Sequence, residues 1–179
     1  TFFVSTTGVD STAPGAGSAA QPFRTIPFAI ANTTGFVTIN VLPGTYLGEF
    51  TIDRELRLEG LGGAVRLVST TPATPTIIVS DANMAITRQT QIKNIEFFGG
   101  TTGIELRGEV GGNGVSPEIV QNTFFGLQAA GIRMIVENEI STNEPWIRYN
   151  VLDGADSGRV GIEIIADGTD GFPSTAVPE

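Results

Sequence analysis

One pattern occurs three times in this 179-residue chain, as NIEFFG at residues 94–99, NTFFG at residues 122–126 and NVLDG at residues 150–154. In each copy an asparagine precedes a short apolar run and a glycine. The asparagines are separated by 28 residues, twice: Asn94, Asn122 and Asn150. A Gly-Ile pair follows each copy, at residues 103–104, 131–132 and 161–162. Recurrence at a nearly constant interval indicates a protein built from internal repeats.

The segments around these repeats have the composition of short β-strands. Apolar and polar residues alternate in them, as in 37–41, and glycine or proline ends most runs. We expect about twelve strands of roughly three to eight residues, among them 84–87, 92–98, 117–125 and 146–152. The one expected helix covers about residues 25–32, where Thr25 is a suitable N-cap and Pro27 fits the first turn. Strands without alternating helices exclude a doubly wound α/β fold.

An interval of 28 residues fits three short strands with their turns, which make one turn of a β-solenoid. Successive turns of such a coil stack about 4.8 Å apart, so equivalent residues lie above one another. We therefore predict an all-β fold, a parallel β-helix of about five coils. In this fold Asn94, Asn122 and Asn150 would form a structural ladder, each side-chain amide donating to the next. Two alternatives stay open: a β-sandwich, and asparagines that lie in unrelated turns.

The composition excludes several classes of function. Nineteen acidic and ten basic residues give a net charge of −9, which argues against a nucleic-acid partner and against binding to anionic lipid. The chain has no histidine and no cysteine. It therefore lacks the usual general base near neutral pH, thiol nucleophiles and the commonest zinc ligands. Because no apolar stretch reaches about 18 residues, we expect no membrane span.

Three further motifs lie in the first quarter of the chain, in the order GVDS at residues 8–11, PFRTI at residues 22–26 and PGTY at residues 43–46. Together with the later repeats, they resemble the pectate-lyase-like superfamily of right-handed parallel β-helix proteins. The resemblance implies a right-handed, single-stranded parallel β-helix with a short N-terminal capping helix. Because that superfamily contains lyases, hydrolases, epimerases, phage tailspikes, adhesins and structural proteins, the resemblance predicts a fold rather than an activity.

The whole chain, residues 1–179, is expected to form a single β-solenoid domain. Its expected parts are an N-terminal strand and loop (1–20), the capping helix (22–32), the coils (36–166) and a C-terminal tail (167–179). No second amphipathic helix follows the last expected strand. We therefore expect the C-terminal coil to be uncapped.

Candidate sites are few. Lys93 is the only lysine; lyases of the resembled superfamily would need it as their base, whereas a solvated lysine pointing out of a strand is the simpler interpretation. Because the clustered aspartates of related glycosidases are also missing, we identify no catalytic residue. A non-enzymatic role is preferred, and enzymatic activity stays open. Two D-G-x-D turns could hold calcium, the one cofactor considered, through oxygen ligands from Asp153, Asp156, Asp167 and Asp170. Ordinary Asp-Gly turns are the alternative.

These features predict a secreted or cell-surface structural protein. The uncapped C-terminal coil would be covered by the N-terminal region of another copy, so that the protein assembles head to tail into a filament, sheath or surface layer. The low lysine content and a start at Thr1 agree with a mature secreted chain, a trimmed chain being the alternative. A competing hypothesis is a carbohydrate-active protein, either a lyase-like enzyme or a glycan-binding module that uses Tyr46, Trp146 and Tyr149. A fragment of a longer adhesin is the third.

Overall fold

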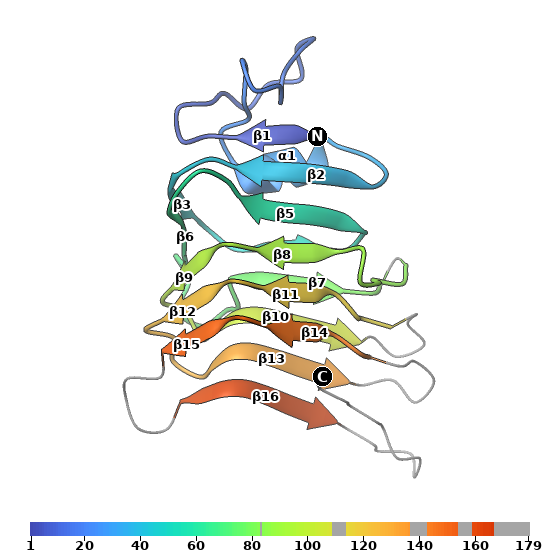
Figure 1. Ribbon diagram of the computed structural model, residues 1–179, viewed down its shortest axis with the longest axis vertical. Helices are drawn as coiled ribbons and strands as arrows, with labels where there is room; N and C mark the ends of the chain where they lie inside the picture. Colours follow the sequence, from blue (N-terminus) through green and yellow to red (C-terminus); the bar gives the residue numbers. More distant parts are fainter. Residues whose placement is uncertain (83, 109–113, 137–142, 154–158, 167–179) are drawn as a thin grey trace.

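The computed structural model describes residues 1–82, 84–108, 114–136, 143–153 and 159–166. Within these residues the protein is all-β apart from one short helix, α1 (Ile26–Ala31). The strands stack into three parallel sheets along the long axis of the molecule (Figure 1).

From β2 onward, each sheet takes every third strand of the chain, and β1 adds an end strand to sheet A. Sheet A has the order β1 (Phe2–Val4), β2 (Val37–Val41), β5 (Leu56–Gly60), β8 (Gln91–Lys93), β11 (Glu118–Val120) and β14 (Trp146–Arg148). Sheet B has the order β3 (Gly44–Leu47), β6 (Val65–Val68), β9 (Glu96–Phe98), β12 (Thr123–Phe125) and β15 (Val151–Asp153). Sheet C has the order β4 (Phe50–Ile52), β7 (Ile77–Ser80), β10 (Thr102–Gly108), β13 (Ala130–Val136) and β16 (Val160–Ala166).

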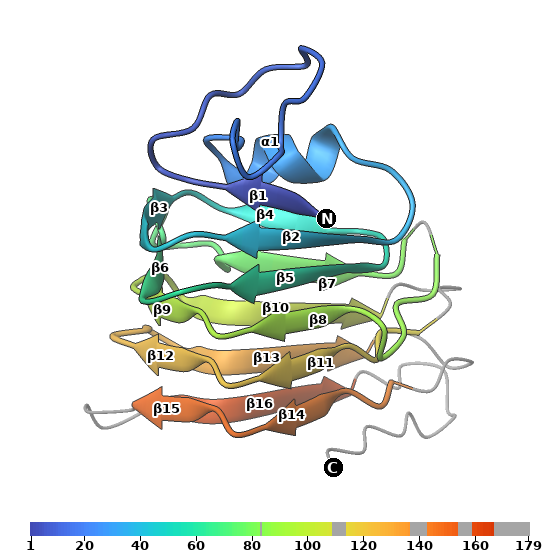
Figure 2. The same cartoon turned by 45° about the horizontal axis from the view of Figure 1, so that its top comes forward.

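From β2 onward the chain enters sheets A, B and C in the same order each time. We call three such successive strands, one from each sheet, a rung. Figure 2 shows the rungs as levels of one stack, with α1 beyond its N-terminal end. Every pairing between the described strands is parallel, which excludes the antiparallel β-sandwich considered from the sequence. The arrangement is compatible with a β-solenoid.

The core runs through the stack as columns of apolar side chains. Alternate residues of each strand point inward, so parallel pairing places like residues over like residues. The Gly-Ile repeat is one such column, because Ile104 pairs in register with Ile132 and Ile132 with Ile162. In a second column the rings of Phe97 and Phe124 stack with their centroids 4.8 Å apart. The sequence repeats thus reflect contacts between neighbouring rungs.

Three expected strands are each divided in two by the structure. The segments 92–98, 117–125 and 146–152 each contain one strand of sheet A and one of sheet B. Between the two strands, Asn94, Gln121 and Tyr149 adopt a left-handed backbone conformation with φ of 57°. This conformation interrupts the extended chain and turns it into the next sheet. Since only asparagine favours it among these residue types, the sequence signalled one of the three corners.

A strand over 84–87 was wrong, because Ile86 makes only an isolated bridge to Val115. The expected helix is confirmed. Thr25 is its N-cap, with a side-chain oxygen that accepts a hydrogen bond from the backbone N–H of Phe28. The helix buries Ile26, Ala29 and Ile30 against the core.

Candidate functional site

The asparagines of the repeated pattern lie where the chain turns from sheet A into sheet B. Asn122 is 1% exposed. Its side-chain amide donates to the side-chain oxygen of Asn150 at 3.1 Å and to the carbonyl of Ile92 at 2.9 Å. Its own side-chain oxygen accepts from the backbone N–H of Ile95 at 3.1 Å. Asn122 and Asn150 therefore join three successive rungs through side-chain hydrogen bonds.

Asn94 does not continue this ladder, which corrects the expected set of three. Glu118 pairs with Gln91, an interval of 27 rather than 28 residues. Consequently Glu96 pairs with Thr123, and Ile95 rather than Asn94 faces Asn122. The side-chain amide of Asn94 instead donates to the carbonyl of Gly60 at 2.8 Å, one rung earlier.

The proposed calcium ligands are divided by the limits of the described chain. Asp153 lies at the exposed end of β15, whereas Asp156, Asp167 and Asp170 fall outside the described residues. Across the part of the chain that the structure describes, no three acidic side chains gather so that they could hold a metal ion. Nor does any described helix have the length and apolar character needed to cross a bilayer.

A charged cluster covers the outer side of sheet A around Glu118. This carboxylate accepts hydrogen bonds from Arg148, from Nε at 2.9 Å and from Nη2 more closely, and from the side-chain amide of Gln91. Burial alone would raise the pKa of Glu118. The hydrogen bonds from Arg148 and Gln91 and the charges of Arg148 and Lys93 outweigh burial and lower this pKa. Lys93 thus lies near enough to Glu118 for its charge to act on this carboxylate.

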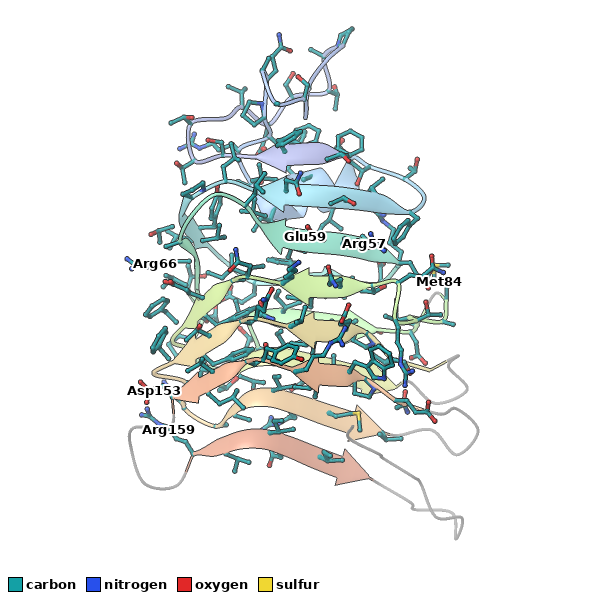
Figure 3. The ribbon with its side chains drawn as sticks, viewed as in Figure 1. Arg57, Glu59, Arg66, Met84, Asp153 and Arg159 are labelled. Atoms are coloured by element: carbon teal, nitrogen blue, oxygen red, sulfur yellow. The ribbon has the colours of Figure 1, made fainter. Side chains whose placement is uncertain are left out.

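Arginines also surround the single tryptophan, at one end of this outer side. The guanidinium carbons of Arg88 and Arg148 lie 4.2 Å and 5.0 Å from the centre of the Trp146 ring. Arg88 and Arg57 line one shallow hollow next to this ring. Figure 3 shows Arg57 and Glu59 together on β5. The sequence did not reveal this cluster, because its members lie far apart along the chain and come together only where neighbouring strands pair.

The aromatic residues considered for sugar stacking do not form one platform. Tyr46 is 6% exposed, and its hydroxyl donates to the carbonyl of Leu42 at 2.7 Å. Burial raises the pKa of Tyr46, despite an opposing backbone hydrogen bond at Thr6. Trp146 already carries two guanidinium groups over its ring, and Tyr149, 78% exposed, occupies the turn after β14.

A row of alternating charges follows the outer side of sheet C. Glu105, 3% exposed, accepts from Nε of Arg107 at 2.6 Å and lies 3.7 Å from Nη1 of Arg133. Arg133 in turn donates from Nε to Glu163 at 2.6 Å, one rung later. Each carboxylate has an arginine partner, so the row ties neighbouring strands together and leaves no free acid–base pair.

The last rung, formed by β14, β15 and β16, has exposed apolar side chains on its inner columns. Ile104 and Ile132 are both 0% exposed, yet Ile162 in the same column is 37% exposed. The next column repeats the change, from 3% at Met134 to 38% at Ile164. Because β16 is the end strand of sheet C, these inward side chains have a covering rung on one side only among the described residues. At this end of the stack, apolar side chains of the inner columns are therefore partly exposed within the described part of the chain.

Comparisons with protein-family models, with curated proteins and with solved structures found no match for this chain. The resemblance to the pectate-lyase-like superfamily therefore stays a prediction from the sequence motifs. Any function has to be argued from the surfaces described above.

Proposed function

We propose that the protein is a structural β-solenoid that associates with copies of itself through its last rung. In this proposal the three sheets are the sides of one right-handed parallel β-helix of about five coils. Two observations support it: the sheets are visited in a fixed order, and all described pairings are parallel. Right-handedness is the rule for a crossover between parallel strands of one sheet.

The two ends of the stack differ, which supports a role for α1 as the N-terminal cap. α1 contributes Ile26, Ala29 and Ile30 to the same core as the strands. It covers the first rung, which would otherwise expose apolar columns as the last rung does. The far end has no equivalent helix among the described residues.

The exposure of Ile162 and Ile164 is the observation that carries the proposal. Side chains that are fully buried in the preceding rungs are more than one third exposed here. Covering them with another surface removes apolar area from water at about 25 cal/mol per Å², the dominant driving force for association. A secreted or cell-surface location and a filament, sheath or layer as the final assembly remain predictions from the sequence.

Sedimentation velocity over a range of protein concentrations tests the proposal. We expect a concentration-dependent oligomer that Ile164→Lys abolishes, because the change places a charge among the exposed inner columns. Val9→Lys is the matched control, since Val9 is 67% exposed in the N-terminal loop far from the last rung. A protein that stays monomeric at high micromolar concentration contradicts the proposal.

A second candidate function, binding of an acidic polysaccharide, rests on the hollow that Arg57 of β5 and Arg88, in the segment before β8, line beside sheet A. Guanidinium groups suit carboxylates of uronic acids. Since Trp146 is the only tryptophan and Arg88 lies over its ring, ligand binding there would change tryptophan fluorescence. Titration with polygalacturonate and alginate should give a saturable change that Arg57→Ala weakens and Arg66→Ala, on sheet B, does not. Absorbance of unsaturated uronate products tests for lyase activity in the same samples.

A further inference from the structure

We propose that the N-terminal end of sheet B binds an extended peptide, which pairs with the outer edge of β3 and places one apolar side chain in the cavity beside that edge. The proposal is independent of self-association, because this end of the stack lies opposite the last rung (Figure 2). All residues that form the site lie within residues 1–82, which the structure describes without a gap.

One edge of β3 is open to a further strand. β3 is the end strand of sheet B and pairs with β6 alone among the described strands. The backbone N–H groups of Gly44 and Gly48 donate to carbonyls on the β6 side, at 3.0 and 3.2 Å. Because backbone groups alternate between the two edges of a strand, those of Thr45 and Leu47 face the other edge. Such an edge is a template for the addition of an extended peptide.

In sheet A the chain itself occupies the corresponding edge. The backbone N–H of Phe3 on β1 donates to the carbonyl of Gly17 at 2.8 Å, and the carbonyl of Phe3 accepts from the N–H of Phe23 at 2.9 Å. After β1 the chain continues into a loop and α1, so no described strand precedes β3 in sheet B. The site for an added strand is therefore in sheet B and not in sheet A.

A cavity of about 270 Å³ lies between the start of α1 and this edge. Its floor includes Ile26, Tyr46 and Leu67, which are all buried in the core. Tyr46 pairs with Leu67 and Leu67 with Phe97, so the cavity is at the end of an inner column. Pockets that take drug-sized ligands have about 300–1,000 Å³; this smaller one suits a single large apolar side chain. A peptide residue that enters it extends the inner column by one rung.

The outer side of the same edge is apolar as well. Leu47 is 68% exposed. It begins an outer column of sheet B in which it pairs with Val68, Val68 with Phe98 and Phe98 with Phe125. A strand paired with β3 would place an outward side chain beside Leu47 and cover part of it.

Arg24 indicates the charge of the peptide. It is the one charged residue among the described residues that line the cavity. Its guanidinium forms no ion pair within the described part of the chain, where Asp10 accepts from the backbone N–H groups of Arg24 and Thr25 instead. An acidic residue next to the apolar anchor would give Arg24 a partner.

Fluorescence anisotropy with a labelled hexapeptide tests the apolar anchor and the charge. The peptide alternates threonine and valine around a central phenylalanine, which aspartate follows. We expect saturable binding that exchange of this phenylalanine for alanine weakens at least ~10-fold, because its burial drives binding. Exchange of the aspartate for asparagine should weaken binding by up to ~5-fold. Arg24→Ala should reduce affinity for the aspartate peptide only, and Arg57→Ala, at an exposed arginine of sheet A, is the control.

The paired edge has its own test. Thr45→Pro removes the N–H that faces the peptide and should weaken binding about 10-fold, whereas Thr45→Ala keeps this group and should stay within ~2-fold of the parent. Circular dichroism verifies the fold of both variants. Two peptides methylated on alternate backbone nitrogens supply a second measurement on the parent protein, because only methylation of the edge that faces β3 should abolish binding.

Three results would overturn the proposal. The first is no saturable binding at ~1 mM peptide, or equal binding of the two methylated peptides. The second is binding of free 3-phenylpropanoate as tightly as the peptide, which would make the cavity a site for small acids without strand pairing. The third is peptide binding to Ile164→Lys but not to the parent protein, since another copy would then cover β3.

Discussion

Asn122 shows why a buried polar side chain can stabilise a stack of rungs. Its amide and its carbonyl oxygen are both hydrogen bonded while the residue is 1% exposed. Asn122→Ala should lower the free energy of unfolding by about 1–3 kcal/mol, because the carbonyl of Ile92 and the N–H of Ile95 lose their partners in a dry environment. Urea denaturation measures the change. Asn40→Ala, at a half-exposed position of β2, is the control and should stay within about 0.5 kcal/mol of the parent; equal effects would contradict the role of Asn122.

Two glutamates make stability depend on acid. The pKa of Glu49 and the pKa of Glu118 both lie below the usual 4.5. Burial alone would raise them, but hydrogen bonds outweigh burial; at Glu49 these come from Ser69, Thr71 and Thr70. A folded-state pKa below the unfolded value stabilises the fold above that value, and the stabilisation is lost as the pH falls through the folded pKa. We therefore expect the urea midpoint to fall below about pH 5. The double variant Glu49→Gln/Glu118→Gln should have a lower urea midpoint at neutral pH, and this midpoint should fall less steeply as the pH is lowered. If the midpoint depends on pH as in the parent protein, these carboxylates are not the source of the acid dependence.

The glycines of the Gly-Ile repeat make close approach of neighbouring rungs possible. A Cβ at position 103 would lie 2.5 Å from the Phe124 ring and 2.8 Å from the carbonyl oxygen of Gly131. At position 161 the nearest atom would be a flexible Leu152 methyl at 3.3 Å. Gly103→Ala should therefore destabilise the protein by about 1–3 kcal/mol, as overpacking does. Gly161→Ala is the matched control and should be nearly neutral. Thermal unfolding of both variants decides, and equal melting temperatures would show that the ring of Phe124 can move aside at little cost.

The sequence predicted those elements that a single local rule determines. It did not predict the contacts that depend on how neighbouring strands pair. The helix followed from its cap, Thr25, and the GVDS motif gains its meaning from the carboxylate of Asp10, which accepts from the N–H groups of Arg24 and Thr25 at 2.8 and 3.0 Å. Counting intervals placed the Gly-Ile column in register but misplaced Asn94 by one position. A rung that is one residue shorter moves every later residue without changing the pattern of residue types. The cluster around Glu118 depends on the same register, which explains why it was missed.

A stack in which each rung contacts only its neighbours should be least stable at an uncovered end. In sheet C the inner strands pair on both sides, whereas the end strands β4 and β16 pair only with β7 and β13 among the described strands. In the monomer, the amides of β16 should therefore exchange hydrogen faster than those of β13 and β10. Association through the last rung supplies the missing neighbour. The exchange of the β16 amides should therefore slow by roughly 15-fold when the total protein concentration is about 100 times the dissociation constant of a pair of copies, since about 7% of the protein is then monomeric. The amides of β1, whose outer edge is bonded within the chain, should show no such dependence. Mass-spectrometric hydrogen exchange at two concentrations measures both strands at once. Protection that grows at β1 instead would move the contact to the N-terminal end, because only a surface that becomes buried on association can slow exchange in proportion to concentration.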